Sequence, residues 1–434
     1  MADHPIYFVL AGFWLLTMAQ GTWALVDGLK FYAFVARAVA TREDSHAAAN
    51  PPPARRHATV ILPCCGVDDK LEQTVAALRD QDYAEYDVIF TFESADDPAY
   101  SAIGRWVADW GRTTWVRVVA GPTERRSQKV HNLLAAVDRL DDRCEVLVFL
   151  DSDAVPDSTW LSQLVAPLDD PKLGAATGFR WYSAAGGFVA GVRSAWNAAS
   201  VSMMHNDKTN FCWGGSTAVS RETYESLNIA KRWDGALSDD YQLTRAIRDA
   251  GLGIRFVPQA LLPSADAIGF AGFWQFARRQ LVITRVCAPG LWLAGVILCC
   301  NFINGATCMF AVLAAGLLGL ADVPSGILAA AFAGWAVIIA LAGIKAFVRQ
   351  LAVRKLLHPP HHGWRDMAWD VAGVAPIGML HLALLIASAG SRRITWRNRV
   401  YELVSPDETR VLTTDGCGDG HSTTRVAVGP QRAT

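Results

Sequence analysis

The sequence predicts an α/β protein, with a parallel sheet covered by helices in its middle and membrane helices toward both ends. Uncharged apolar stretches long enough to cross a bilayer occur near the N-terminus and again after residue 285. Charged residues make up only 19% of the chain and are spread unevenly. Between the apolar stretches, short apolar runs recur about every thirty residues and alternate with helix-periodic segments, a pattern typical of β-α-β units.

The first apolar stretch, residues 6–26, contains no Asp, Glu, Lys or Arg and would span about 31 Å as a helix. A cleaved signal peptide is the alternative, but no Lys or Arg precedes this stretch. We therefore expect an anchor over residues 1–30 and a linker over residues 31–57. The positive-inside rule places the following block in the cytoplasm, because three basic residues come next: Lys30, Arg37 and Arg42.

Two further apolar stretches, residues 286–321 and 323–344, are separated by a Pro-Ser-Gly turn and predict two transmembrane helices over residues 286–345. Another uncharged run lies within residues 346–404 and is followed by several arginines. A full crossing would place those arginines outside, so we expect a re-entrant or interfacial segment there. Residues 405–434, rich in Gly and Thr, are expected to be a disordered tail.

The middle block, residues 58–285, is expected to form one cytoplasmic α/β domain. Its helical segments are clearest over residues 130–140, where apolar residues follow the i, i+3, i+4, i+7 spacing of one buried face. Ligands bind beyond the carboxyl ends of the strands in such sheets. Four strands are predicted, at residues 59–62, 88–92, 116–120 and 146–150, and we expect ligand-binding residues directly after them.

The fourth predicted strand ends in Asp151-Ser152-Asp153. Two converging carboxylates at a pocket rim suit a hard cation such as Mg²⁺ or Mn²⁺, which bridges to substrate phosphates. The alternative is a turn that caps the following helix, with Asp157 or Ser158 as N-cap. The near-neutral net charge of −1 gives no reason to expect nucleic acid as a partner, and GxGxxG and GxxxxGK[ST] motifs are absent.

Three more motifs carry candidate chemistry. Asp239 and Asp240 follow a plausible N-cap, Ser238, and could cap a helix or place a general base at the site. The turn containing Trp213, Gly214, Gly215 and Ser216 could admit a ligand close to the backbone or form an ordinary hairpin. A basic cluster before the second membrane stretch could grip a diphosphate or lipid headgroups; its members are Gln275, Arg278, Arg279, Gln280 and Arg285.

Together these motifs resemble those of membrane-anchored GT-A glycosyltransferases of families 2 and 21, the ceramide glucosyltransferase group. The resemblance covers about residues 5–405 and rests on ATVILPCCGVDDKLEQTVAALRDQDY, VIFTFESADDPAY, SQKVHNLL, FLDSDAVPD, WGGSTAVSR, LSDDYQLTRAI and ITWRNRVYEL in this order. It implies a Rossmann-like GT-A domain and an inverting, metal-dependent hexosyltransferase. The donor would be a UDP-linked nucleotide sugar, and the acceptor a ceramide-like or other membrane lipid.

The resemblance also implies roles for individual residues. Asp240 would be the catalytic base, and Asp151 and Asp153 would hold the Mg²⁺ or Mn²⁺. Trp213, Gly214, Gly215, Ser216 and Asp239 would line the acceptor side. The basic cluster would meet the diphosphate or the acceptor. The donor would be bound by Pro63, Gly66, Glu93, Asp96, Asp97, Lys129, Asn132 and Ser152.

One motif of these families is incomplete, because no Trp completes (Q/R)xxRW within residues 275–285. A different acceptor lipid, such as a diacylglycerol or a polyprenoid, is consistent with that departure. The alternatives are a processive polysaccharide synthase, which would need more membrane helices and that Trp, and a non-catalytic transporter or scaffold that binds a nucleotide. We expect an integral protein of the bacterial inner membrane with its catalytic domain in the cytoplasm.

Overall fold

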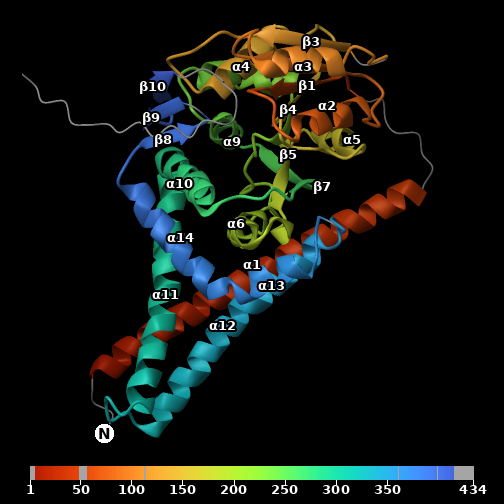
Figure 1. Ribbon diagram of the computed structural model, residues 1–434. Helices are drawn as coiled ribbons and strands as arrows, with labels where there is room; N and C mark the ends of the chain where they lie inside the picture. The colour runs from red at the N-terminus through yellow and green to blue at the C-terminus, as the bar shows by residue number, and fades with distance from the viewer. Residues whose placement is uncertain (1–4, 48–55, 112–113, 360, 398, 415–434) are drawn as a thin grey trace, which may run out of the picture.

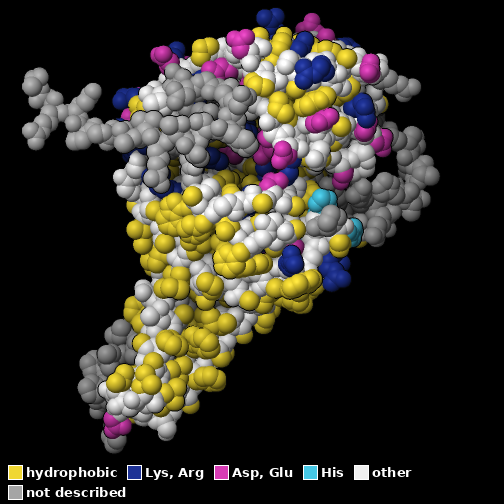
Figure 2. All heavy atoms as spheres, viewed as in Figure 1, with side chains coloured by type: hydrophobic (Ala, Val, Ile, Leu, Met, Phe, Trp, Pro, Cys, Tyr) yellow, Lys and Arg dark blue, Asp and Glu magenta, His cyan; other side chains and the backbone are white. Residues whose placement is uncertain are grey.

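The computed structural model describes residues 5–47, 56–111, 114–359, 361–397 and 399–414. An α/β block occupies one end of the molecule, and long helices extend from it as a stalk (Figure 1). Hydrophobic side chains cover most of the visible stalk, whereas charged side chains gather on the α/β block (Figure 2). This division matches the uneven distribution of charge along the sequence.

The α/β block is built on a seven-stranded sheet with the order β3-β2-β1-β4-β6-β5-β7. The four strands predicted from the sequence are present and parallel. β6 runs antiparallel to both of its neighbours, which the sequence did not indicate. The strands are β1 (Ala58–Pro63), β2 (Tyr86–Phe92), β3 (Thr114–Val119), β4 (Val146–Leu150), β5 (Leu173–Tyr182), β6 (Ser216–Ser220) and β7 (Gly253–Ser264).

Helices cover both faces of this sheet, so that β1, β2 and β4 are buried along almost their whole length. One face packs against α2 (Leu71–Arg79), α3 (Pro98–Trp106) and α5 (Trp160–Val165). The opposite face packs against α4 (Gln128–Val137), α7 (Arg221–Ser226), α8 (Ile229–Trp233) and α9 (Asp239–Asp249). The carboxyl ends of the central strands are left as the open edge where side chains can meet a ligand.

Three long helices form the stalk: α1 (Pro5–Ala47), α11 (Pro289–Leu317) and α12 (Ser325–Val353). Among the described residues, α11 and α12 are each long and apolar enough to cross a bilayer. α1 packs along both of them (Figure 1), and the Thr17 hydroxyl donates to Asn301 O at 3.2 Å. The described part of the predicted N-terminal anchor, residues 5–30, therefore runs beside the two candidate spans.

The linker expected over residues 31–57 is wrong for its first part, because α1 continues to Ala47. Phe31 and Val35 are fully buried against the α/β block and α12. Their i, i+4 spacing extends the apolar face of the helix past Lys30, where the predicted anchor ended. Residues 48–55, which include the proline-rich part, lie outside the described residues.

The segment after α12 does not form one straight helix. α13 (Trp364–Ala372) and α14 (Val374–Ala389) meet at a bend of 69° and could be counted together as a third, broken span or as a re-entrant loop. A three-stranded antiparallel sheet follows, β8 (Arg393–Trp396), β9 (Arg399–Ser405) and β10 (Glu408–Thr414). The disordered tail expected from residue 405 is wrong as far as Thr414, because β10 pairs with β9 there. Residues 415–434 lie outside the described residues.

Candidate functional site

Asp151, Ser152 and Asp153 leave the carboxyl end of β4, near the middle of the sheet. The Asp151 N–H donates to Gly215 O at 3.2 Å, so the turn that precedes β6 lies against this segment. The side chains of Asp151 and Asp153 are 29% and 38% exposed, and both can meet a ligand from solvent. Asp157, the alternative cap, accepts from Thr159 N at 2.8 Å within its own turn.

Lys129, on the first turn of α4, joins the two acidic motifs. Its Nζ lies 2.9 Å from Asp151 Oδ1 and 3.4 Å from Asp239 Oδ2, and it donates to Gly214 O at 3.1 Å. Burial alone would lower the pKa of this ammonium group, but the carboxylates of Asp151, Asp239 and Asp240 raise it well above its ordinary value. Lys129 therefore keeps its positive charge at the centre of the site.

Arg180, near the end of β5, is a site residue that the sequence analysis missed. Its guanidinium binds Asp153 in a bidentate pair, with distances of 2.8 Å to Oδ2 and 2.5 Å to Oδ1. It also lies 5.3 Å from the ring centroid of Trp213. Burial alone would raise the pKa of Asp153, but the Arg180 charge and hydrogen bonds hold it well below its usual range. A single arginine within an apolar strand belongs to no motif, so the sequence carried no signal for it.

The two Asp carboxylates offer the oxygen donors that Mg²⁺ and Mn²⁺ prefer. No group of three or more His, Cys, Asp or Glu side chains that could hold a metal occurs in the described part of the chain. A cation at Asp151 and Asp153 would take its other ligands from substrate phosphates and water, as Mg²⁺ usually does. Because Arg180 binds both oxygens of Asp153 and Lys129 binds Asp151 Oδ1, such a cation would share these carboxylates with the two basic side chains and would arrive with its substrate.

Asp239 and Asp240 begin α9, with Ser238 as the N-cap that the sequence indicated. Asp239 is buried beneath Lys129, and this burial raises its pKa to about 6 although the ammonium group opposes the shift. Asp240 is half-buried, and its carboxylate accepts from Tyr241 N at 2.8 Å and from Gly214 N at 3.4 Å. Of the two neighbours, Asp240 is the one that a ligand can reach.

The raised pKa of Asp239 predicts a loss of stability as the pH rises from about 4 to about 6. A carboxyl group with a raised pKa holds its proton more tightly in the folded chain. The stability from that proton is complete below the ordinary pKa of 3.8 and is lost as the pH rises through about 6. We expect the urea midpoint of the detergent-solubilised chain to fall in this range, and Asp239→Asn to flatten the curve.

The control for that experiment is Asp249→Asn, at the exposed end of the same helix, where the side chain is 52% exposed. It should leave the pH dependence of the urea midpoint as in the wild type. A curve for Asp239→Asn that still falls between pH 4 and 6 would contradict the assignment.

Gly214 and Gly215 lie too close to the acidic groups to carry side chains. A Cβ at position 214 would lie 2.3 Å from Asp239 Oδ2, and one at position 215 would lie 2.6 Å from Asp151 Oδ2 and 2.2 Å from the Trp213 ring. The glycine turn therefore positions carboxylates from two elements. Ser216 differs from the expectation, because its buried hydroxyl accepts from Trp160 Nε1 at 2.8 Å within the core and does not line the acceptor side.

We predict that Gly215→Ala lowers transferase activity by about tenfold or more and destabilises the fold by about 1–3 kcal/mol, the usual cost of overpacking. The added methyl group would displace the Asp151 carboxylate or the Trp213 ring. Initial rates and the urea midpoint measure both effects. Gly269→Ala is the matched control, because no atom lies within 4 Å of its added Cβ. Equal activity of the two variants would contradict the prediction.

Asp97, which was expected to bind the donor, stabilises the loop after β1. Its carboxylate accepts from Gly66 N at 3.0 and 3.1 Å and from Ala99 N at 2.8 Å, which fixes the loop after β1 to the start of α3. Gly66 has a φ of +68°, a conformation that favours glycine. Pro63 ends β1, and Asp96 is exposed beside this loop. Direct donor contacts by these residues stay a prediction.

Glu93 and Asn132 are held by protein groups. Glu93, after β2, forms an ion pair with Arg399 of the C-terminal sheet. The buried Asn132 accepts from Gln128 Nε2 at 2.9 Å on its own helix. Their expected role in donor binding is thus also a prediction, and the structure gives Glu93 a part in attaching the C-terminal sheet.

The basic cluster lies on α10 (Phe270–Cys287), and its side chains contact different parts of the chain. Arg278 donates to Ala387 O at 3.2 Å and Arg285 to Ser391 O at 2.9 Å, so these two hold the C-terminal segment. Gln275 is exposed, and Gln280 accepts at its backbone oxygen from the Thr284 hydroxyl.

Arg279 is the member of the basic cluster that turns toward the site. Burial lowers the pKa of its guanidinium, and the charges of Asp151 and Asp153 act on it in the opposite direction. Its guanidinium carbon lies 5.5 Å from the ring centroid of Trp396. Gln275 and Arg278 have the Q-x-x-R spacing of the incomplete motif, and Arg279 stands in the place of its Trp. The ring of Trp396, from the C-terminal sheet, packs against Arg279.

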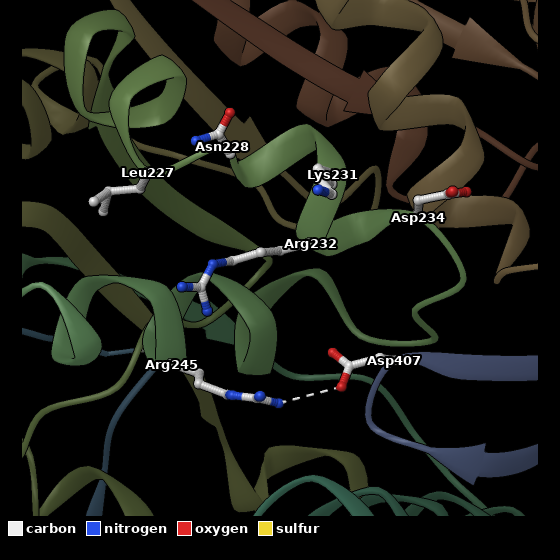
Figure 3. Close-up of a pocket in the computed structure, with 7 residues that line it drawn as sticks. All are labelled: Leu227, Asn228, Lys231, Arg232, Asp234, Arg245 and Asp407. Carbon is white, nitrogen blue, oxygen red and sulfur yellow. Dashed lines mark hydrogen bonds and ion pairs between the residues drawn. The ribbon is translucent and has the colours of Figure 1, made fainter.

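A separate pocket of about 520 Å³ lies between α8, α9 and the turn between β9 and β10 (Figure 3). Arg245 and Asp407 face each other across it at 3.5 Å. None of the expected site residues lines it; the lining residues are Leu227, Asn228, Lys231, Arg232, Asp234, Arg245 and Asp407. The chemistry of the acidic motifs is therefore not located in this pocket.

The order of the motifs, the sheet and the acidic edge correspond to one family of enzymes. A model of glycosyl transferase family 21 matches residues 25–409. The chain belongs to this family. As a member of glycosyl transferase family 21 it is a glycosyltransferase, and the expected α/β fold of the GT-A type is confirmed.

Single proteins are less similar to the chain than the family model is. No curated protein matches the chain. A mannosyltransferase from Pyrobaculum calidifontis, solved with GDP-mannose and Mn²⁺, is 18% identical over 87% of this chain and 97% of its own, with a TM-score of 0.43. Glucosyl-3-phosphoglycerate synthase from Mycobacterium tuberculosis, solved with Mn²⁺ and UDP-glucose, is 16% identical over 52% of this chain and 77% of its own, with a TM-score of 0.34.

Proposed function

We propose that this family 21 glycosyltransferase moves a sugar from a nucleotide sugar, UDP-linked, to a hydroxyl group of a membrane lipid. The observation that carries the proposal is the cluster formed by Asp151, Lys129 and Asp240 at the carboxyl edge of the sheet. Nucleotide ligands bind at this edge in open α/β sheets. Candidate membrane helices begin directly after α10, which carries Arg279 toward the same cluster.

Asp151 and Asp153 would hold a Mg²⁺ or Mn²⁺ ion. When bound, that ion would neutralise the diphosphate and act as a Lewis acid for its departure. The chain's own cations have complementary tasks: Lys129 keeps Asp151 and Asp239 in place, and Arg180 keeps Asp153 ionised and fixed in direction. Arg279 adds a positive charge on the side of α10, where the leaving diphosphate would lie.

Asp240 is the residue that we assign as general base. Its carboxylate is held in direction by backbone N–H groups of Tyr241 and Gly214 and is half-exposed to an incoming ligand. It takes the proton of the acceptor hydroxyl while that oxygen bonds to the anomeric carbon and the bond to the diphosphate breaks. A single base without a covalent nucleophile gives inversion at that carbon, by the reasoning that separates the two glycosidase geometries.

The membrane topology that we propose keeps the whole C-terminal part on the side of the α/β block. At the start of the bent α13–α14 segment, Asp366 accepts from Ala184 N at 2.8 Å. Arg278 and Arg285 hold the end of the segment against α10. Both ends thus contact the same side of the molecule, which favours a re-entrant or interfacial segment. The catalytic block would lie in the cytoplasm, with acceptor lipids reaching the site from the bilayer surface.

The direct test incubates membranes that contain the protein with each common nucleotide sugar and a panel of lipids that includes ceramide, diacylglycerol and a polyprenyl phosphate. The expected result is one glycosylated lipid that depends on one donor, and its loss on addition of a chelator. Failure of every donor to label any lipid, with protein that is folded and inserted, would overturn the proposal.

A further inference from the structure

The C-terminal sheet places an unusual arginine at the edge of the site. Arg397 follows β8 directly, and Trp396 pairs with Arg399 across the hairpin. The φ of Arg397 is +51°, a conformation that Gly and Asn adopt readily and that costs other residues about 1 kcal/mol or more. The strained backbone therefore presents a charged side chain that is 50% exposed at the tip of the hairpin.

The hairpin is fixed to the α/β block and cannot place Arg397 elsewhere without breaking several contacts. Arg399 forms an ion pair with Glu93 at the end of β2. The Tyr401 hydroxyl accepts from Gln128 N at 3.3 Å, and Gln242 of α9 donates to Asp407 at 2.9 Å. These contacts reach β2, α4 and α9, the elements that surround the acidic edge.

The charge of Arg397 lies beside the loop that follows β1. Its Nη2 lies 3.7 Å from Asp68 Oδ2, too far for a hydrogen bond, and Asp68 Oδ1 already accepts from Lys70 N at 3.1 Å and Leu71 N at 2.9 Å in the turn before α2. Arg397 is also the chain neighbour of Trp396, whose ring centroid lies 5.5 Å from the guanidinium carbon of Arg279. Arg397 therefore lies between the loop after β1 and the contact of the hairpin with α10.

Two arginines that repel one another across an open edge are a ready site for an anion. Arg279 approaches from α10 and is braced by Trp396, and Arg397 approaches from the adjacent residue of the hairpin. Guanidinium groups bind phosphate oxygens in pairs with fixed geometry, and an anion between the two arginines would offset their mutual repulsion.

We propose that Arg397 and Arg279 together bind the diphosphate of the nucleotide, so that the C-terminal sheet completes the donor site. The inference rests on the proposed nucleotide-sugar donor. Arg397 acts by direct contact with the β-phosphate side of the nucleotide, which leaves the nucleoside to the loops after β1 and β2.

The test is Arg397→Asn in the full-length detergent-solubilised chain, with UDP, GDP, UMP and GMP as probes in the presence of Mn²⁺. Asn suits the left-handed conformation, so the thermal midpoint should stay unchanged or rise. The Kd of the preferred nucleoside diphosphate should rise about tenfold, while that of the monophosphate changes by less than about twofold. Arg397→Lys keeps the charge but not the paired geometry of the guanidinium, and it should retain more of the affinity than Arg397→Asn and less than the wild type.

Arg410→Asn is the matched control, because Arg410 lies on the same C-terminal sheet and pairs with its neighbour Glu408 at 3.1 Å. Its diphosphate affinity should equal that of the wild type. The inference is overturned, while the proposed function stands, in two cases. Either Arg397→Asn binds the diphosphate as tightly as the wild type does, or its affinities for the nucleoside diphosphate and the monophosphate fall by the same factor. If the wild type binds neither UDP nor GDP, the proposed donor is wrong and the inference falls with it.

Discussion

Asp240→Asn is expected to lower the rate of sugar transfer by about three orders of magnitude, within the range that general bases contribute. The amide keeps the shape of the side chain, and its oxygen can still accept from Tyr241 N and the Ser238 hydroxyl, whereas its NH2 group replaces the oxygen that accepts from Gly214 N at 3.4 Å. It cannot take a proton from the acceptor hydroxyl. The rate of lipid glycosylation with saturating donor measures the effect.

The matched control is Asp234→Asn, an acid 46% exposed shortly before the same helix, which should retain full activity. Nucleotide binding should be unchanged in Asp240→Asn, which separates a lost base from a damaged donor site. A transporter or scaffold that binds a nucleotide predicts the reverse, because its function would survive the substitution. Normal transfer by Asp240→Asn would remove this residue from the mechanism.

Asp239 is the rival for the role of base, and its surroundings argue against it. It is buried beneath Lys129 and touches the backbone of the glycine turn, so an acceptor hydroxyl has no path to its oxygens. Its raised pKa of about 6 reflects this burial. We therefore expect Asp239→Asn to reduce activity through the position of Lys129 and to shift the pH dependence of stability, a combination that Asp240→Asn should not show.

The parallel half of the fold could be predicted because each of its strands is a short apolar run that ends in polar residues. β4 and the Asp-Ser-Asp motif are the clearest example, with five buried residues before the first carboxylate. The antiparallel β6 could not be predicted, because strand direction depends on pairing with residues distant in sequence and leaves no local signal. The same is true of β8–β10: β8 and most of β9 lie in the predicted basic end of residues 346–404, and β10 lies in the predicted disordered tail.

Within the site, the acids could be predicted and their partners could not. Asp151, Asp153, Asp239 and Asp240 occur in pairs after apolar segments, a pattern that is visible in one dimension. Arg180, Arg397 and Trp396 come from segments that only folding brings to the same edge. Ser216 shows the opposite error, because a residue inside a recognisable motif can face the core when strand alternation directs it there.

The second large effect is expected at the predicted metal ligands. Asp151→Asn and Asp153→Asn should each lower the rate of transfer by about a hundredfold or more and raise the Kd of Mn²⁺, measured by electron paramagnetic resonance in the presence of nucleotide. The loss of a carboxylate also removes the nearest acidic partner of a buried cation: Lys129 beside position 151, which keeps only Asp239 at 3.4 Å, or Arg180 beside position 153. An uncompensated buried charge is costly, so both variants should also unfold at lower urea concentration.

Asp157→Asn in the same loop is the matched control, because its carboxylate caps a local turn through Thr159. It should keep the Mn²⁺ affinity and the rate of the wild type. The two effects at Asp153 can be separated with Arg180→Met combined with Asp153→Asn, which removes the unpaired guanidinium. This double variant should recover stability but not Mn²⁺ binding or transfer. Recovery of transfer would show that the ion pair with Arg180, and not a metal, is what Asp153 contributes.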